Sequence, residues 1–374
     1  MKLSNVVVSL SVAAAVHARP AYQAHEARQL SAPGVLDEVL LFDGLAVTDA
    51  AGNTRADVSA YVSLRTPDLG IATAAVTALL SSLGIPVGNS LNILQDRLKT
   101  VASIGLPRKK VEISVPGCAN KATLPSTSID DLGLSNGIVS LGRCGGARET
   151  EATVSPGLFD SRRFKASIFS SANSGFGVLS DIDDTIKVSN VLDRIALLKS
   201  TLLEEPKAVP GMPELYASLA TSLNSPQFVY LTATPYQFYP FLNRFVDSAY
   251  SASKGPILSQ NLTIVDIPEA IEFISSSNTF AYKVSQIDRV QALYPNKKFL
   301  LIGDSTQADP EVYAASARKH GGFVSCIWIR QVEGANNAPE RFAETFLGLD
   351  GKFRVFSDDQ IAGLADIDIA GGAC

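Results

Sequence analysis

Two aspartates near the middle of the chain have the type and spacing of a catalytic pair. The apolar run 177–180 predicts a short buried strand, and Asp181, Asp183 and Asp184 follow it within four positions. A core strand cannot continue through these charges, so they must stand at its end. In extended backbone Asp181 and Asp183 project to the same side. Such a pair suits Mg²⁺, and one carboxylate could then attack phosphorus while the other moves the leaving-group proton. The triplet alone is equally typical of a solvated acidic turn or a Ca²⁺ loop.

Three further polar residues follow this pair in positions that could complete a phosphoryl-transfer site. Thr232 ends a second apolar run and Asp304 ends a third, with Asp309 a little further on. Ligands of open α/β sheets bind beyond the carboxyl ends of the strands. We therefore expect the Thr232 hydroxyl to contact a phosphoryl oxygen and Asp304 to join the metal's carboxylate ligands. Lys283, between the second and third runs, could neutralise the charge that builds on phosphorus.

Apolar strands and helices alternate through the second half of the chain, which is typical of a mostly parallel α/β sheet. Besides 177–180, the predicted strands are 227–231, 299–302, 323–329 and 352–356. Pro213 and Pro310 each predict a helix start, the latter with Asp309 as N-cap. Ser357 and Gln360 have the spacing of a capping box.

The first half of the chain is rich in short strands. These are predicted at 39–42, 60–64, 111–115, 137–141 and 163–168. Turn residues separate them, so we expect a small β-sandwich or barrel that ends in a polar linker at 169–176. Two helices, 73–83 and 90–104, interrupt the strands. Their Ala, Leu and Ile residues are typical of packed core helices, and a membrane-contacting surface is the alternative.

Length and composition suggest two soluble domains. The chain has 374 residues, of which 46% are hydrophobic and 18% charged, enough apolar content for sizeable cores. The formal net charge of −5 disfavours a nucleic-acid partner and makes long-range attraction to an anionic membrane weak. We expect no transmembrane segment.

The amino terminus has the three parts of a secretory signal, so we expect residues 1–18 to be removed after Ala18, leaving a flexible lead-in over 19–34. Four cysteines in such a protein are compatible with two disulfides, and by proximity we pair Cys118 with Cys144 and Cys326 with Cys374. Buried free thiols are the alternative. A glycosylation sequon begins at Asn261. These features favour a secreted protein or one in the secretory-pathway lumen.

The polar residues at the strand ends resemble the four motifs of the haloacid dehalogenase (HAD) superfamily of phosphotransferases. The segment Asp181–Thr185 is similar to its first motif, Thr232 to its second, Lys283 to its third and Gly303–Ser305 to its fourth. The resemblance implies a HAD-like Rossmannoid parallel sheet with strand order 3-2-1-4-5. It also implies an aspartyl-phosphate on Asp181, with Asp183 as acid and then base. Mg²⁺ would rest on Asp181, the Asp183 carbonyl and Asp304.

A narrower resemblance covers roughly residues 163–332. The segments 180–187, 209–212, 234–240 and 302–313 look like the catalytic domain of fungal actin-patch-protein type phosphatidate phosphatases. That family usually has serine at the position of Thr232. Its cytosolic members bind cortical actin partners, whereas a secretory signal is expected here. The resemblance implies Mg²⁺-dependent hydrolysis of phosphatidate to diacylglycerol.

The expected organisation is therefore a signal peptide, a lead-in, a β-rich domain with a helical insertion over 35–168, the linker and a catalytic domain over 177–374. No folded lid is expected between the motifs, so a phospholipid in a membrane surface could reach the site. The alternatives are a HAD-type phosphatase acting on another organic phosphate or a phosphoprotein, and a catalytically silent lipid-binding module.

Overall fold

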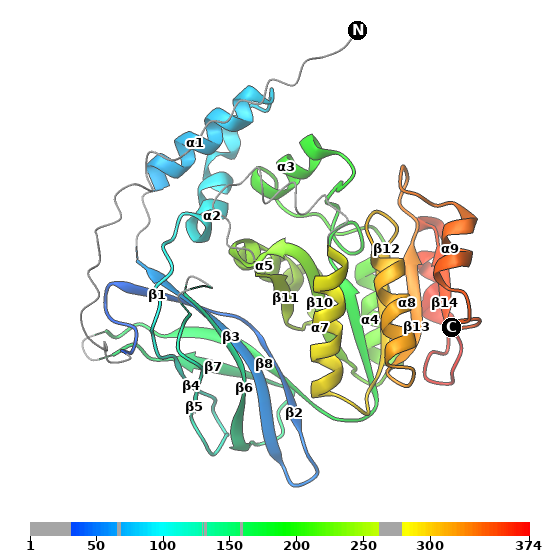
Figure 1. The fold of residues 1–374 in the computed structure, drawn as a ribbon, viewed down its shortest axis with the longest axis horizontal. Helices are drawn as coiled ribbons and strands as arrows, with labels where there is room; N and C mark the ends of the chain where they lie inside the picture. The colour runs from blue at the N-terminus through cyan, green and yellow to red at the C-terminus, as the bar shows by residue number, and fades with distance from the viewer. Residues whose placement is uncertain (1–30, 66–68, 129, 131–132, 158–159, 262–278) are drawn as a thin grey trace.

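A computed structural model describes residues 31–65, 69–128, 130, 133–157, 160–261 and 279–374. It shows a β-rich part packed beside an α/β part, with a helical hairpin extending from the first (Figure 1). The predicted signal peptide, its cleavage site and residues 262–263 of the sequon lie outside the described residues. None of the helices described is both long and apolar enough to cross a bilayer.

The amino-terminal strands form one curled sheet. They are β1 (Asp37–Leu41), β2 (Gly44–Thr48), β3 (Asn53–Leu64), β4 (Glu112–Ser114), β5 (Ala122–Thr123), β6 (Leu134–Arg143), β7 (Glu149–Val154) and β8 (Phe164–Ala172). Their order in the sheet is β1-β3-β2-β8-β7-β4-β5, and β6 pairs with β3. The Cys118–Cys144 disulfide and a hydrogen bond from Ala119 N–H to the Arg143 carbonyl (2.8 Å) bring its two edges together. The described strands thus belong to a single hydrogen-bonded sheet, and the sandwich form of the prediction is not confirmed.

Two details of the predicted domain limits differ in the structure. Strand β8 continues through Ala172, so the predicted linker 169–176 is shorter than expected: Ser170 pairs with β2 and its hydroxyl lies 2.9 Å from that of Thr48. In the lead-in, residues 31–34 are hydrogen-bonded to the β-rich part, because Lys110 N–H donates to Ser31 O (2.9 Å).

The carboxyl-terminal part is a parallel sheet. Its strands are β9 (Phe176–Asp181), β10 (Gln227–Pro235), β11 (Ile257–Gln260), β12 (Lys298–Asp304), β13 (Val324–Arg330) and β14 (Phe353–Phe356). They lie in the order β11-β10-β9-β12-β13-β14. Counted along the chain from β9, this order is 3-2-1-4-5-6. Strand β11 was not predicted from the sequence.

Helices cover both faces of this sheet. On one face lie α3 (Arg194–Leu202), α4 (Met212–Ser222) and α5 (Tyr239–Ala249), and on the other lie α7 (Phe280–Leu293), α8 (Asp309–Lys319) and α9 (Pro339–Thr345). Short 3₁₀ turns complete the described elements: η1 (Gly88–Ser90), η2 (Tyr236–Phe238), η3 (Ser251–Ser253) and η5 (Asp358–Asp366). Alternate residues of β9 enter opposite cores, Val178 on the α4 side and Leu179 on the α7 side. The strand is therefore buried on both faces up to its polar end.

Several smaller predictions can be compared directly with the structure. Both predicted disulfides are present, Cys118–Cys144 and Cys326–Cys374. The capping box at Ser357 is confirmed, and it begins the 3₁₀ turn η5. Asp309 is not an N-cap: that position is Ala308, and Asp309 is the first residue of α8.

The helical hairpin contacts helices α3 and α5 of the α/β part. It consists of α1 (Leu69–Ser82) and α2 (Leu91–Val101). The Arg97 guanidinium of α2 stacks on the Phe241 ring of α5 at 4.0 Å and donates to the Thr201 carbonyl of α3 at 3.3 Å. Tyr294, directly after α7, donates its hydroxyl hydrogen to the Ala46 carbonyl of β2 at 2.6 Å. These contacts join the two parts.

Candidate active site

All five residues selected from the sequence are buried and lie together at the carboxyl ends of the strands of the parallel sheet. Asp181 is the last residue of β9, Asp183 follows it, and Asp304 is the last residue of β12. Thr232 lies in β10, next to a register shift, and Lys283 lies in the first turn of α7. Because β10, β9 and β12 are parallel neighbours, their carboxyl ends meet at this edge.

Lys283 is the cation at the centre of the cluster. Its ammonium lies 2.6 Å from Asp181 Oδ1 and 2.5 Å from Asp309 Oδ1, and the whole side chain is buried. Burial alone would lower the pKa of Lys283, but the two carboxylates outweigh it and raise that pKa. The lysine is therefore held as a cation beside Asp181.

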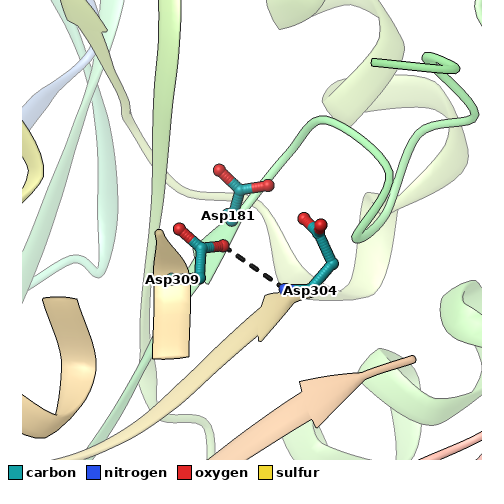
Figure 2. A group of neighbouring side chains, drawn as sticks. All are labelled: Asp181, Asp304 and Asp309. Atoms are coloured by element: carbon teal, nitrogen blue, oxygen red, sulfur yellow. Dashed lines mark hydrogen bonds between the residues drawn. The ribbon is translucent and has the colours of Figure 1, made fainter. Parts of the chain in front are cut away.

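Three aspartates could hold a metal ion. One carboxylate oxygen from each of Asp181, Asp304 and Asp309 lies within 4.8 Å of the other two (Figure 2). Figure 2 shows the Asp181 and Asp309 carboxylates next to each other, with Asp304 on the adjacent strand end. Asp181 Oδ2 is buried without a hydrogen-bond partner. Buried carboxylate oxygens, one of them unpaired, are the ligands expected for a hard divalent cation such as Mg²⁺.

The electrostatics of the cluster also favour a cation. Burial raises the pKa of Asp181 well above its usual range, and the Asp309, Asp304 and Asp183 charges raise it further against the attraction of Lys283. Burial and the Asp309 charge raise the pKa of Asp304 to about 7. These carboxylates repel one another in a low-dielectric site, so a bound divalent cation would stabilise their ionised forms.

Asp183 has a different environment, because four donors surround its carboxylate. Lys187 Nζ (3.2 Å) and Ser189 Oγ (2.6 Å) donate to Oδ1, and Thr232 Oγ1 (2.7 Å) and Thr234 Oγ1 (2.9 Å) donate to Oδ2. Burial works to raise the pKa of Asp183, but the Lys187 charge and the hydroxyl donors lower it to about 2. In this arrangement the Thr232 hydroxyl positions Asp183, whereas the sequence analysis expected it at a phosphoryl oxygen.

Asp184 shapes the loop that presents Asp183. Its φ of 57° is left-handed, which sharply turns the chain after β9. Its carboxylate accepts the backbone N–H groups of Ser189, Asn190 and Val191 at 2.7–2.8 Å. The third carboxylate of the triplet thus has a structural role and fixes the loop over the site.

The segment that joins Asp304 to Asp309 is held from outside by Arg341 of α9. The Arg341 guanidinium donates to the Ser305 carbonyl (2.8 Å), to the Gln307 carbonyl (2.7 Å) and to Glu311. Asp309 is itself anchored, because its Oδ2 accepts the Asp304 N–H at 3.3 Å. The partly buried Arg341 side chain therefore helps to fix the spacing between the two acidic residues.

Sequence reasoning noted Asp309 a little beyond Asp304 but gave it no role in the site, and it did not select Lys187, Ser189 or Thr234 around Asp183. Asp309 had been interpreted as a helix cap. The one signal available for it was a carboxylate five residues after Asp304, at the start of a helix. Nothing in the local pattern distinguished Lys187 from an exposed lysine, although its side chain is buried.

Comparisons with known proteins match the part of the chain that carries this site. A family model described as "Phosphatidate phosphatase APP1, catalytic domain" matches residues 176–331. The phosphatidate phosphatase APP1 of Saccharomyces cerevisiae is 28% identical over 159 residues, which are 42% of this chain and 26% of that protein. An uncharacterized protein of Schizosaccharomyces pombe is 24% identical over 162 residues, with the same coverage of 42% and 26%. The chain thus matches about a quarter of the length of these relatives.

Proposed function

We propose that the protein is a Mg²⁺-dependent phosphatidate phosphatase, because residues 176–331 match the catalytic-domain model of phosphatidate phosphatase APP1. The products would be diacylglycerol and phosphate. One observation carries the proposal: Lys283, Asp304 and Asp309 converge on the buried carboxylate of Asp181 within the matched segment. The strand order of the sheet supports a HAD-like fold for this domain.

In the proposed reaction Asp181 is the nucleophile. One of its carboxylate oxygens forms a bond to phosphorus, the bond from phosphorus to the lipid oxygen breaks, and the lipid leaves as diacylglycerol once that oxygen gains a proton. Lys283, held beside Asp181, stabilises negative charge on the phosphoryl oxygens. Water then cleaves the aspartyl-phosphate and releases phosphate.

Asp181, Asp304 and Asp309, with the backbone carbonyl of Asp183, are the proposed Mg²⁺ ligands. Bound there, the ion would supply positive charge to the phosphoryl group and would help to align it. Asp309 adds a second function, because it also holds the Lys283 ammonium in place.

Asp183 is the proposed general acid and then general base, and its surroundings favour the role of base. With its pKa lowered to about 2, it is ionised at neutral pH and can accept a proton from the attacking water. To donate a proton to the leaving lipid, Asp183 must first be protonated. A weaker contact with Lys187 would allow this, because it would raise the pKa of Asp183.

We place this activity outside the cytosol. Two disulfides fit a secreted or lumenal protein, and the predicted signal peptide gives the same location. The phosphatidate substrate would then be met at a membrane surface.

The proposal is tested by phosphate release from phosphatidate in mixed micelles, with Mg²⁺ and with a chelator. We expect metal-dependent release by the wild type and a loss of about a thousandfold or more in Asp181→Asn. Lys319→Met, an exposed change, is the control. Absence of metal-dependent release would contradict the proposal, and turnover that survives Asp181→Asn would remove the nucleophile assignment. A panel of soluble monoesters separates a lipid phosphatase from one acting on another organic phosphate.

A further inference from the structure

The helical hairpin of α1 and α2 carries a long segment without charge. Residues 69–95 contain no Asp, Glu, Lys, Arg or His, which makes 27 consecutive uncharged positions. The chain as a whole is 18% charged, so a segment of this length would ordinarily hold several charges. The segment includes α1, the turn between the helices and the first half of α2.

The hairpin packs through one face and leaves apolar side chains on the other. Val76 and Leu80 of α1 are buried in one core with Leu94 of α2. Leu83 and Leu91, at the two ends of the turn, remain 45% and 43% exposed. A surface helix of a soluble domain normally presents charged residues to water. A group of exposed apolar residues within an uncharged segment instead indicates a surface that binds a protein, a ligand or a membrane.

The hairpin is fixed to the edge of the sheet that carries the candidate active site. Arg97 joins α2 to Phe241 of α5 and to the end of α3. Helix α3 follows the loop that contains Asp183, and α5 follows the end of β10 through the turn η2. Figure 1 shows α1 extending away from both sheets. The uncharged turn is thus held at a distance from the body, on elements that continue from the site.

The lack of charge indicates which kind of partner this surface fits. Residues 69–95 contain Ser, Thr, Asn and Gln, but no charged group that could pair with charges on a protein partner. Exposed Leu and Ile side chains can be buried at the boundary between the headgroups and acyl chains of a bilayer, and the binding strength scales with the apolar area buried. If the substrate is phosphatidate, as the proposed function holds, its phosphate lies at that same depth.

We propose that the turn between α1 and α2 inserts shallowly into a phospholipid surface and docks the catalytic domain on it. The insertion is driven by apolar burial of Leu83, Leu91 and their neighbours. Because the inserting segment is uncharged, binding is insensitive to ionic strength and does not require anionic lipid. This inference rests on the proposed function for its purpose, but its test does not require turnover.

The test uses the full-length Asp181→Asn protein, so that substrate is not consumed. Its binding to phosphatidylcholine vesicles, with and without added phosphatidate, is measured by flotation at low and high NaCl. We expect Leu83→Asp/Leu91→Asp to lower the partition coefficient at least about tenfold. The matched control is Ile138→Asp/Leu347→Asp, which changes two apolar residues that are 51% and 77% exposed elsewhere. It should bind as the parent does.

Three outcomes would overturn the proposal. One is equal binding by the hairpin variant and the control, and another is binding that high salt removes, because charge would then dominate. The third is a dimer, seen by sedimentation velocity without lipid, that only the hairpin variant dissociates, because the surface would then bind a second copy. With active protein, the hairpin variant should keep its rate on a soluble short-chain phosphatidate within about twofold. Vesicle binding without any phosphatase activity would sustain the docking surface while refuting the proposed function.

Discussion

Replacement of Lys283 by Met tests whether charge balance holds the candidate active site together. The lysine is buried, and its ammonium contacts Asp181 at 2.6 Å and Asp309 at 2.5 Å. Methionine has a similar length but no charge, so the variant leaves two buried carboxylates without their cation. Loss of one partner from a buried ion pair costs about 3–5 kcal/mol of stability. Because two carboxylates lose their partner here, we expect the upper part of that range.

The cost should depend on pH in a defined direction. Burial already raises the pKa of Asp181 above its unfolded value, with Lys283 opposing that rise. In Lys283→Met the folded-state pKa of Asp181 rises further, so the folded protein binds a proton that the unfolded chain does not bind. The loss of folding stability in Lys283→Met, relative to the wild type, is therefore largest at neutral and alkaline pH. It becomes smaller as the pH falls toward about 5.

The assay is urea unfolding of the metal-free protein, followed by tryptophan fluorescence. Trp328, the one tryptophan of the chain, is buried in β13 and reports on the parallel sheet. Lys319→Met is the matched control, because Lys319 also pairs with an aspartate at 2.6 Å, but at the surface. Exposed pairs of this kind contribute less than about 1 kcal/mol.

Two results would refute the reasoning. The first is a loss of stability in Lys283→Met no larger than that in Lys319→Met. The second concerns the triple variant Lys283→Met/Asp181→Asn/Asp309→Asn, in which the unpaired charges are gone. If it is as unstable as Lys283→Met alone, the loss comes from packing and not from charge.

Three further perturbations follow from the same structure. Arg341→Ala should weaken Mg²⁺ binding about tenfold or more by calorimetry, because it frees the segment between the acidic residues; unchanged affinity would contradict this role. Burial raises the pKa of Asp43 to about 6, so the folded state loses stability as pH rises from about 4 through 6, by up to about 3 kcal/mol. Urea titrations should show Asp43→Asn more stable than the wild type above that window and equal to it below. Cys326→Ser/Cys374→Ser opens a loop with a sequence separation of 48 residues and should cost up to about 4 kcal/mol in the same assay.

The position of the site at the carboxyl ends of the strands was predictable, because short stretches of sequence indicate where each strand ends. A carboxylate or hydroxyl directly after a run of buried residues can lie only at a strand end, and parallel strands bring such ends together. Asp181, Thr232 and Asp304 were found in this way. Lys283 gave no such signal: it was selected because it lies between the second and third strands and could neutralise charge on phosphorus, and the family resemblance then agreed with that selection.

The predictions that failed depend on contacts between distant segments. Strand β11 has four residues, of which Ser259 and Gln260 are polar, and it is defined by its pairing with β10. The start of the predicted linker is a strand because residues 169–172 pair with β2, and Phe169 also pairs with β7. Asp309 has the sequence of a helix cap but lies beside Lys283 and Asp181. No local pattern contains these partners.

Gly303 shows why Asp309 can reach the site, and its replacement tests that explanation. A Cβ atom at this position would overlap Asp309 Oδ2 and would lie 2.7 Å from Cε2 of Tyr313. The Asp309 carboxylate therefore occupies space that only a glycine leaves open. In Gly303→Ala the carboxylate must move, which breaks its bond to the Asp304 N–H and disturbs the Lys283 contact. Overpacking of this kind costs about 1–3 kcal/mol.

The expected result for Gly303→Ala is a loss of Mg²⁺ affinity of about tenfold or more, together with that loss of stability, measured by calorimetry and urea unfolding. Gly363→Ala is the matched control, because an added Cβ there would meet nothing within 4 Å. If Gly303→Ala retains the wild-type affinity, Asp309 is not required for the metal, and Asp181 and Asp304 hold it without a third carboxylate. If affinity falls while stability does not, the alanine is accommodated by movement of Asp309 alone, and the affinity then measures what this single carboxylate contributes to the site.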